Sequence, residues 1–181
     1  MFLDVRGFTR LSESLPPTEL VRRLNRFYEV ATQPVIERDG TLDKLVGDQV
    51  VAFFGTPYND RAHERRAVEA ALDIVRAMSD KADGERLAVG GAVGTGEAFV
   101  GNVGGGETRD YTAIGDVVNT TSRLQGEAAV GELLIMETTY AAVADAFPGL
   151  EARSYALRGK AEPVTARVLR LAASGGADRV V

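Results

Sequence analysis

The chain has 181 residues, 45% of them hydrophobic and 26% charged, with a formal net charge of −5. This length predicts a single domain with a sizeable core. The acidic balance argues against a nucleic-acid-binding protein, and no apolar run approaches the roughly 20 residues that span a bilayer. Cysteine is absent and His63 is the single histidine, so a thiolate site is excluded and a histidine-based triad or zinc site is disfavoured.

The first forty residues predict a strand, a turn and a long helix. Residues 1–5 form the strand and residues 6–9 the turn. The helix follows Pro17, with Thr18 as its N-cap, a kink at Pro34 and an end at Asp39-Gly40. Its apolar positions recur at helical spacing: Leu20, Leu24, Phe27, Ala31 and Val35.

The middle of the chain predicts a hairpin, a helix and glycine-rich strands. Residues 41–46 and 49–54 flank the turn dipeptide Gly47-Asp48. Asp60 is the expected cap of the next helix, whose charged start places His63 on a solvated face. The core stripe of that helix is Val68, Ala71, Leu72, Val75 and Met78. Strands over 87–95, 97–103 and 108–114 follow, with a loop at 104–106.

The last third predicts a helix over 117–124 capped by Asp116, a strand over 133–136 and a helix over 140–146. Final strands cover 155–157 and 164–171 around a turn at 158–160. The expected fold class is α+β, with a split βαβ, ferredoxin-like sheet that is mostly antiparallel and carries helices on one face. Residues 1–172 form the domain and 173–181 a flexible tail.

The N-terminal residues give two expectations, one for the cellular location of the domain and one for whether the chain was cut from a longer protein. Asp4 and Arg6 interrupt any signal-peptide pattern, and with the lack of cysteine this predicts a cytoplasmic domain without membrane contact. Only three residues precede Asp4, so we expect a chain that was cut from a longer one or that begins abruptly.

Asp4 ends the first apolar strand. A carboxylate there must be solvated or liganded, because burying a bare charge is costly. Gly7 permits a tight turn, and the amides that follow it suit phosphate oxygens. A strand-end aspartate that caps a turn is the alternative interpretation.

Asp48 lies at the tip of the predicted hairpin. Two carboxylates on adjacent strand ends can hold two divalent cations on a triphosphate, and hard oxygen ligands suit Mg²⁺ or Mn²⁺. A plain hairpin turn is the alternative interpretation of Gly47-Asp48.

Asn119 and Arg123 are four residues apart and share one face of a helix. An amide beside a guanidinium can orient a ribose and neutralise a phosphoryl group. An exposed polar helix face is the alternative.

Three ordered motifs resemble those of the class III adenylate and guanylate cyclases. They are Phe-Leu-Asp-Val-Arg-Gly-Phe-Thr at 2–9, Lys-Leu-Val-Gly-Asp at 44–48, and Asp-Tyr-Thr-Ala-Ile-Gly-Asp-Val-Val-Asn-Thr-Thr-Ser-Arg at 110–123. The resemblance runs from Phe2 to about Leu171. It implies the cyclase fold and a site shared between two subunits.

The resemblance also assigns roles. Asp4 and Asp48 match the metal-binding aspartates, joined by the Val5 carbonyl, for two Mg²⁺ or Mn²⁺ ions per site. Lys44 matches the lysine that reads the base, and Thr112 stands where many members have aspartate, as in class IIIb. Asn119 and Arg123 match the pair that stabilises the transition state. The phosphate-binding positions are the turn Gly7, Phe8 and Thr9, and Lys160 or its alternative, Arg158.

The base preference follows from donors and acceptors. Lys44 can donate to adenine N1 and Thr112 can accept from the adenine amino group, whereas guanine reverses this edge. Because threonine can donate as well as accept, we expect it to discriminate less sharply than aspartate would.

We therefore expect an adenylate cyclase that acts on ATP as a head-to-tail homodimer, with a regulatory domain in a longer parent chain. The alternatives are a guanylate or mixed-specificity cyclase, and a silent nucleotide-binding module.

Overall fold

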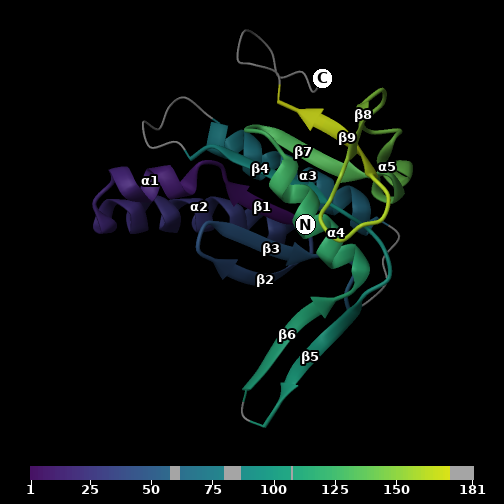
Figure 1. Ribbon diagram of the computed structural model, residues 1–181. Helices are drawn as coiled ribbons and strands as arrows, with labels where there is room; N and C mark the ends of the chain where they lie inside the picture. The colour runs from purple at the N-terminus through teal and green to yellow at the C-terminus, as the bar shows by residue number, and fades with distance from the viewer. Residues whose placement is uncertain (58–61, 80–86, 107, 172–181) are drawn as a thin grey trace.

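The structure is a computed structural model that describes residues 1–57, 62–79, 87–106 and 108–171. Its centre is a seven-stranded sheet in the order β2-β3-β1-β4-β7-β9-β8 (Figure 1). Neighbouring strands are antiparallel apart from β4 and β7, which are parallel. The strands are β1 (Phe2–Val5), β2 (Thr41–Val46), β3 (Gln49–Phe53), β4 (Val89–Val93), β7 (Glu132–Met136), β8 (Glu151–Tyr155) and β9 (Val164–Arg170).

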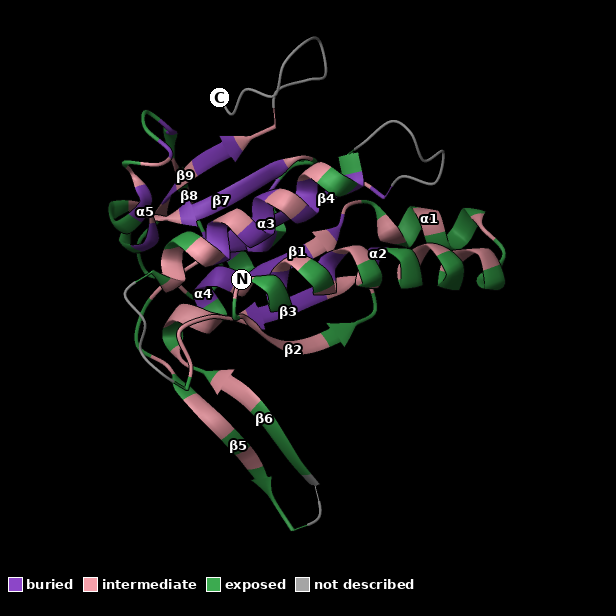
Figure 2. Ribbon diagram, turned by 180° about the vertical axis from the view of Figure 1, so that it is seen from behind, coloured by how far each residue is buried: buried purple, intermediate pink, exposed green. Residues whose placement is uncertain are grey.

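The larger core lies between the sheet and three helices: α2 (Pro17–Glu37), α3 (His63–Ser79) and α5 (Glu137–Val143). Figure 2 shows α2 and α3 in front of the buried strands. Phe27 of α2, Ile74 of α3 and Leu3 of β1 are completely buried in this layer. The burial of these large side chains provides the main driving force for this layer.

A second, smaller core covers the opposite face of the sheet, where α4 (Asp116–Glu127) packs. Leu124 of α4 is completely buried with Leu134 of β7 and Ala92 of β4. The expectation that helices cover one face was therefore wrong. A strand buried on both faces, such as β4, needs apolar cover from each side.

β5 (Phe99–Gly105) and β6 (Thr108–Ile114) form a separate two-stranded hairpin. The hairpin extends away from the body and is largely exposed (Figures 1 and 2). Phe99 is 58% exposed and Ile114 50%. A protruding ribbon with exposed apolar side chains is unusual for an isolated subunit.

Several predicted elements are confirmed. The α+β class, the hairpin of β2 and β3, and the strand over 108–114 agree with the structure. The predicted stripe of α3 is buried throughout. α2 ends at Glu37, close to the predicted stop, and runs through Pro34.

Other boundaries were wrong for identifiable reasons. The predicted turn at 6–9 runs into a short helix, α1 (Phe8–Ser14), because Phe8 and Leu11 share a helical face and pack on the core. α2 begins at Pro17, and Pro16, not Thr18, is its N-cap residue. α5 begins at Glu137 rather than residue 140. β8 spans the polar segment Glu151–Tyr155, which is possible because it is an edge strand with one partner.

The expected Asp60 cap and the expected tail at 173–181 lie outside the described residues. Among the helices of the described segments, none combines the length and apolar character needed to cross a bilayer.

Candidate active site

Asp4 and Asp48 lie together at one end of the central strands. The Val5 amide donates to the Asp48 carbonyl at 3.0 Å, which fixes the end of β1 against the β2–β3 turn. Burial raises the pKa of Asp48, and the neighbouring Asp4 charge raises it further. The predicted pair of carboxylates therefore shares one site, where the two negative charges repel each other.

Arg6 links this pair to α4. Its guanidinium forms a salt bridge with Asp4 at 3.1 Å. Its Nη1 donates to the carbonyls of Gln125 at 3.2 Å and Ala128 at 3.3 Å, at the C-terminal end of α4, where a cation is favoured. Sequence reasoning missed this role, although a cation two residues after a strand-end acid was an available signal.

The donor set fits Mg²⁺ or Mn²⁺. Among the described residues, Arg6 is the one cation that forms a salt bridge with this pair of acids, so the site keeps an excess of negative charge. Within the described residues, no group of three or more acidic, histidine or cysteine side chains forms a complete cage. Mg²⁺ does not require one, because it is usually held by one or two carboxylates together with water and substrate phosphates.

Tyr28 of α2 holds the turn that carries Asp48. Its hydroxyl donates to the Gly47 carbonyl, and Gly47 has φ 60°, a left-handed conformation that glycine adopts without strain. Burial raises the pKa of Tyr28, and the Asp48 charge adds to this effect. The position of Asp48 is thus tied to the packing of a helix distant in sequence.

Lys44 and Thr112 meet through a residue that the sequence analysis did not single out. Asp43 lies 3.3 Å from Lys44 Nζ and accepts a hydrogen bond from Thr112 Oγ1 at 3.0 Å. Lys44 also pairs with Asp110 of β6, and the pKa of Lys44 is raised mainly by that hydrogen bond. The two expected base-reading residues thus belong to one connected cluster.

Asp116, Asn119 and Arg123 follow one another at helical spacing on the surface of α4. Lys160 Nζ lies 2.7 and 2.6 Å from the two carboxylate oxygens of Asp116 and lowers the pKa of that carboxyl. The prediction that Asp116 caps α4 was therefore wrong: Gly115 is the N-cap residue, and the acid binds Lys160.

The turn at 158–160 lies against this helix face. Gly159 has φ 77°, and a Cβ there would lie 3.1 Å from Arg123 Nη1. The structure thus places Gly159 against Arg123 and Lys160 against Asp116 on the same helix, whereas Arg158 is exposed. No hydrogen bond or salt bridge within the described segments joins Asn119 or Arg123 to Asp4 or Asp48.

The remaining predicted positions, Gly7, Phe8 and Thr9, lie at the start of α1. Gly7 has φ 73° and is the N-cap residue, while Phe8 and Thr9 open the helix. Their backbone follows directly from the carboxylate-bearing end of β1, as a phosphate-binding turn would require.

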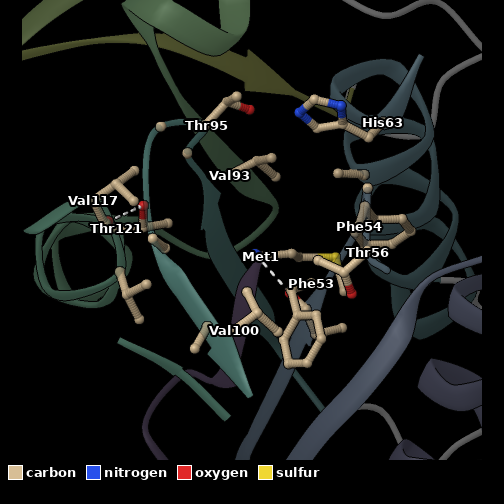
Figure 3. Close-up of a pocket in the computed structure, with 18 of the residues that line it drawn as sticks. Met1, Phe53, Phe54, Thr56, His63, Val93, Thr95, Val100, Val117 and Thr121 are labelled. Carbon is tan, nitrogen blue, oxygen red and sulfur yellow. Dashed lines mark hydrogen bonds between the residues drawn. The ribbon is translucent and has the colours of Figure 1, made fainter. Parts of the chain in front are cut away.

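A cavity of about 440 Å³ lies next to the cluster of Lys44, Asp43 and Thr112, because Asp43 is part of its lining. Figure 3 shows this cavity with Met1, Phe53, His63 and Val117 among the residues around it. Its wall includes Asp43, Ala113 next to Thr112, and Val118 next to Asn119. His63 also lines it and is 21% exposed, so the expected solvated position of this residue was wrong. Apolar walls with a few polar groups are typical of small-molecule sites.

The sequence profile of the adenylate and guanylate cyclase catalytic domain matches residues 1–169. The chain belongs to this family. The class III resemblance of the ordered motifs is thereby confirmed.

Two curated relatives carry the name adenylate cyclase. Adenylate cyclase 1 of Rhizobium meliloti is 34% identical over 132 residues, and the match covers 70% of this chain and 20% of the relative. The adenylate cyclase of Anabaena cylindrica is 35% identical over 131 residues, covering 70% and 26%. The matched part of the cyclase domain thus spans about a fifth to a quarter of these relatives.

Solved structures show the same fold with both nucleotide classes. The guanylyl cyclase Cya2 has a TM-score of 0.84 and 29% identity, and covers 92% of this chain and 88% of its own. The adenylyl cyclase CyaB of P. aeruginosa has a TM-score of 0.81 and 32% identity, covering 97% and 94%. The fold is therefore that of a class III cyclase, and the fold alone does not distinguish an adenylyl from a guanylyl cyclase.

Proposed function

We propose that this domain is an adenylate cyclase that converts ATP to 3′,5′-cyclic AMP and pyrophosphate. The observation that carries the proposal is the connected cluster of Lys44 and Thr112 beside the cavity. An ammonium donor matches adenine N1, and a hydroxyl acceptor matches the adenine amino group. The adenylate cyclases of R. meliloti and A. cylindrica support the same choice.

Asp4, Asp48 and the Val5 carbonyl would hold the divalent cations. Bound there, two cations would lower the pKa of the ribose 3′-hydroxyl and stabilise the leaving pyrophosphate. Side chains and backbone of the protein must then align the ribose 3′-oxygen with the α-phosphorus and stabilise the negative charge that develops there.

Each positioning role has a candidate. Arg123 neutralises charge at the α-phosphate, and Asn119 orients the ribose for in-line attack. The turn at Gly7, Phe8 and Thr9 offers backbone amides to the phosphates, and Lys160 adds a cation once it leaves Asp116.

A second copy would complete the site. Within the part of the chain that the structure describes, Asn119 and Arg123 form no hydrogen bond or salt bridge with the Asp4–Asp48 pair of the same subunit, so we assign them to the site of the neighbouring subunit. The exposed apolar side chains of the β5–β6 hairpin and of β2 provide a surface for this contact: Leu45, Val46, Phe99, Tyr111 and Ile114. A head-to-tail homodimer with two equivalent sites follows.

A guanylate or mixed-specificity cyclase is the second candidate, because the guanylyl cyclase Cya2 shares the fold at a TM-score of 0.84. Parallel assays of the chain with ATP and GTP, in Mg²⁺ and in Mn²⁺, separate these candidates. A chain that binds ATP but produces no cyclic nucleotide would instead be a silent nucleotide-binding module.

Complementation tests the shared site. Asp48→Ala and Arg123→Ala should each be nearly inactive. Mixed in equal amounts they should recover about a quarter of wild-type activity, because half of randomly formed dimers are heterodimers with one intact site of two. Asp48→Ala mixed with Asp4→Ala is the matched control and should recover nothing. Absence of recovery in the first mixture would reject the shared site.

A further inference from the structure

Asp43 lies at an irregularity in β2. Leu42 pairs with Ala52 and Lys44 pairs with Val51, so the register shifts at Asp43. In a regular strand, neighbouring side chains point to opposite faces, whereas a bulge redirects one of them. The 3.3 Å contact between Asp43 and its neighbour Lys44 agrees with such a redirected side chain.

The Asp43 carboxylate is well buried. Its side chain is 6% exposed and lines the cavity beside the base-reading cluster. A buried carboxylate needs hydrogen-bond donors, and Thr112 of β6 supplies one through Oγ1 at 3.0 Å. Lys44 supplies positive charge from the adjacent position.

The bond to Asp43 uses the single proton of the Thr112 hydroxyl. A hydroxyl has one donor and two acceptor lone pairs, so a threonine that already donates can only accept from a further partner. This removes the ambiguity that threonine would otherwise bring to the site.

We propose that Asp43 is a positioning residue for base selection, which fixes the Thr112 hydroxyl as an acceptor and thereby favours adenine over guanine. The inference rests on the proposed function, since it takes Lys44 and Thr112 as the residues that read the base. Asp43 acts through Thr112 and need not touch the nucleotide.

Guanine is disfavoured both at Thr112 and at Lys44. Its O6 requires a donor, and Thr112 could provide one only by leaving a buried carboxylate without that partner. Its N1–H would face the donors of Lys44. The Asp43–Thr112 pair thus gives threonine the acceptor character that aspartate has at this position in other cyclases.

The test is the ratio of kcat/KM for ATP to kcat/KM for GTP. Asp43→Asn keeps the shape but can turn an amide donor toward Thr112, which frees the hydroxyl to donate. We expect the ratio to fall about tenfold, the factor that one net hydrogen bond is worth. Thr112→Val should lower this ratio by a similar factor, because it removes the acceptor, whereas Thr112→Ser should retain the ratio. The ratio of the double variant Asp43→Asn/Thr112→Val should be no lower than that of Thr112→Val, because Asp43 acts through the hydroxyl of Thr112.

Asp110→Asn is the matched control, because Asp110 pairs with Lys44 but makes no hydrogen bond to Thr112 within the described residues. If Asp110→Asn lowers the ATP to GTP ratio of kcat/KM as much as Asp43→Asn does, base selection depends on the partners of Lys44 and not on Thr112, and the proposal is wrong. An Asp43→Asn variant that loses activity equally with both nucleotides would also overturn it, leaving the adenylate cyclase assignment intact. Asp43→Leu, which removes the acceptor without adding a donor, provides a second variant if Asp43→Asn does not fold.

Binding of 3′-deoxy-ATP and 3′-deoxy-GTP separates this proposal from the proposed function, since neither nucleotide can cyclise. Wild type that prefers 3′-deoxy-ATP, with a preference reduced by Asp43→Asn, supports the Asp43 role even if turnover is absent. Wild type without preference between the two overturns both the Asp43 role and the base assignment.

Discussion

The guanidinium of Arg6 lies 3.1 Å from the Asp4 carboxylate while the same side chain donates to carbonyls at the end of α4. The contact joins one predicted metal ligand to the helix that carries Asn119 and Arg123. A change at Arg6 should therefore affect both parts of the site.

Arg6→Ala should reduce the free energy of unfolding by about 2 kcal/mol, because a partly buried carboxylate and several helix-end carbonyls lose their donor. The loss should be larger in EDTA than in Mn²⁺, since a cation can replace the missing charge. Chemical denaturation in both buffers measures it. Arg10→Ala, at an exposed position of α1, is the control, and an equal loss there would contradict this role.

Asp48→Asn should raise the stability of the metal-free protein at neutral pH. The pKa of Asp48 in the folded state lies above its ordinary value of 3.8, so ionisation costs folding free energy. The advantage of the variant should be absent below pH 3.8 and should grow as pH rises through the elevated pKa. Thermal unfolding in EDTA across this range measures it. Added Mn²⁺ should stabilise wild type more than the variant. If the variant is less stable than wild type at pH 7 in EDTA, the carboxylates of Asp4 and Asp48 do not repel each other as inferred.

Lys44→Glu should lower the ATP to GTP ratio of kcat/KM, because a carboxylate can accept from guanine N1–H and repels adenine N1. The new acid would face Asp43 and Asp110, so we also expect a lower melting temperature. Parallel kinetics with both nucleotides give the ratio. An unchanged ratio would remove Lys44 from base selection.

Lys160→Ala should raise KM for ATP about tenfold, as expected for the loss of a charge-assisted bond to phosphate. Arg158→Ala should have a much smaller effect, because Lys160 is held on the Arg123 face by Asp116. Asp116→Asn releases this lysine and should leave catalysis in place. If Arg158→Ala raises KM for ATP more than Lys160→Ala does, Arg158 is the phosphate-binding residue and Lys160 is not.

Phe99→Asp on the β5–β6 hairpin should weaken the homodimer and reduce specific activity at low protein concentration. Sedimentation velocity and activity, measured over the same dilution series, should decline together. Val21→Asp, at a similarly exposed apolar position of α2, should change neither. Loss of activity without dissociation would indicate a local role for Phe99 instead.

The order of the motifs and the local elements could be predicted because they depend on neighbours in sequence. Gly47-Asp48 predicts a hairpin turn, the stripe from Val68 to Met78 predicts the buried face of α3, and the pair Asn119 and Arg123 predicts one helix face. Turn chemistry and helical periodicity are short-range properties, so the sequence alone was enough to predict these local elements. The family and most of the candidate residues followed instead from the resemblance of the three ordered motifs to those of the class III cyclases.

The partners of those residues were decided by the tertiary structure. Asp43 meets Thr112 across 69 residues of sequence, Lys160 meets Asp116 across 44, and Arg6 reaches the end of α4 across 119. The bulge in β2, the packing of α4 on the second face of the sheet and the position of the last turn create these contacts. Local patterns cannot specify them, because which polar groups meet depends on how distant elements pack around a common core.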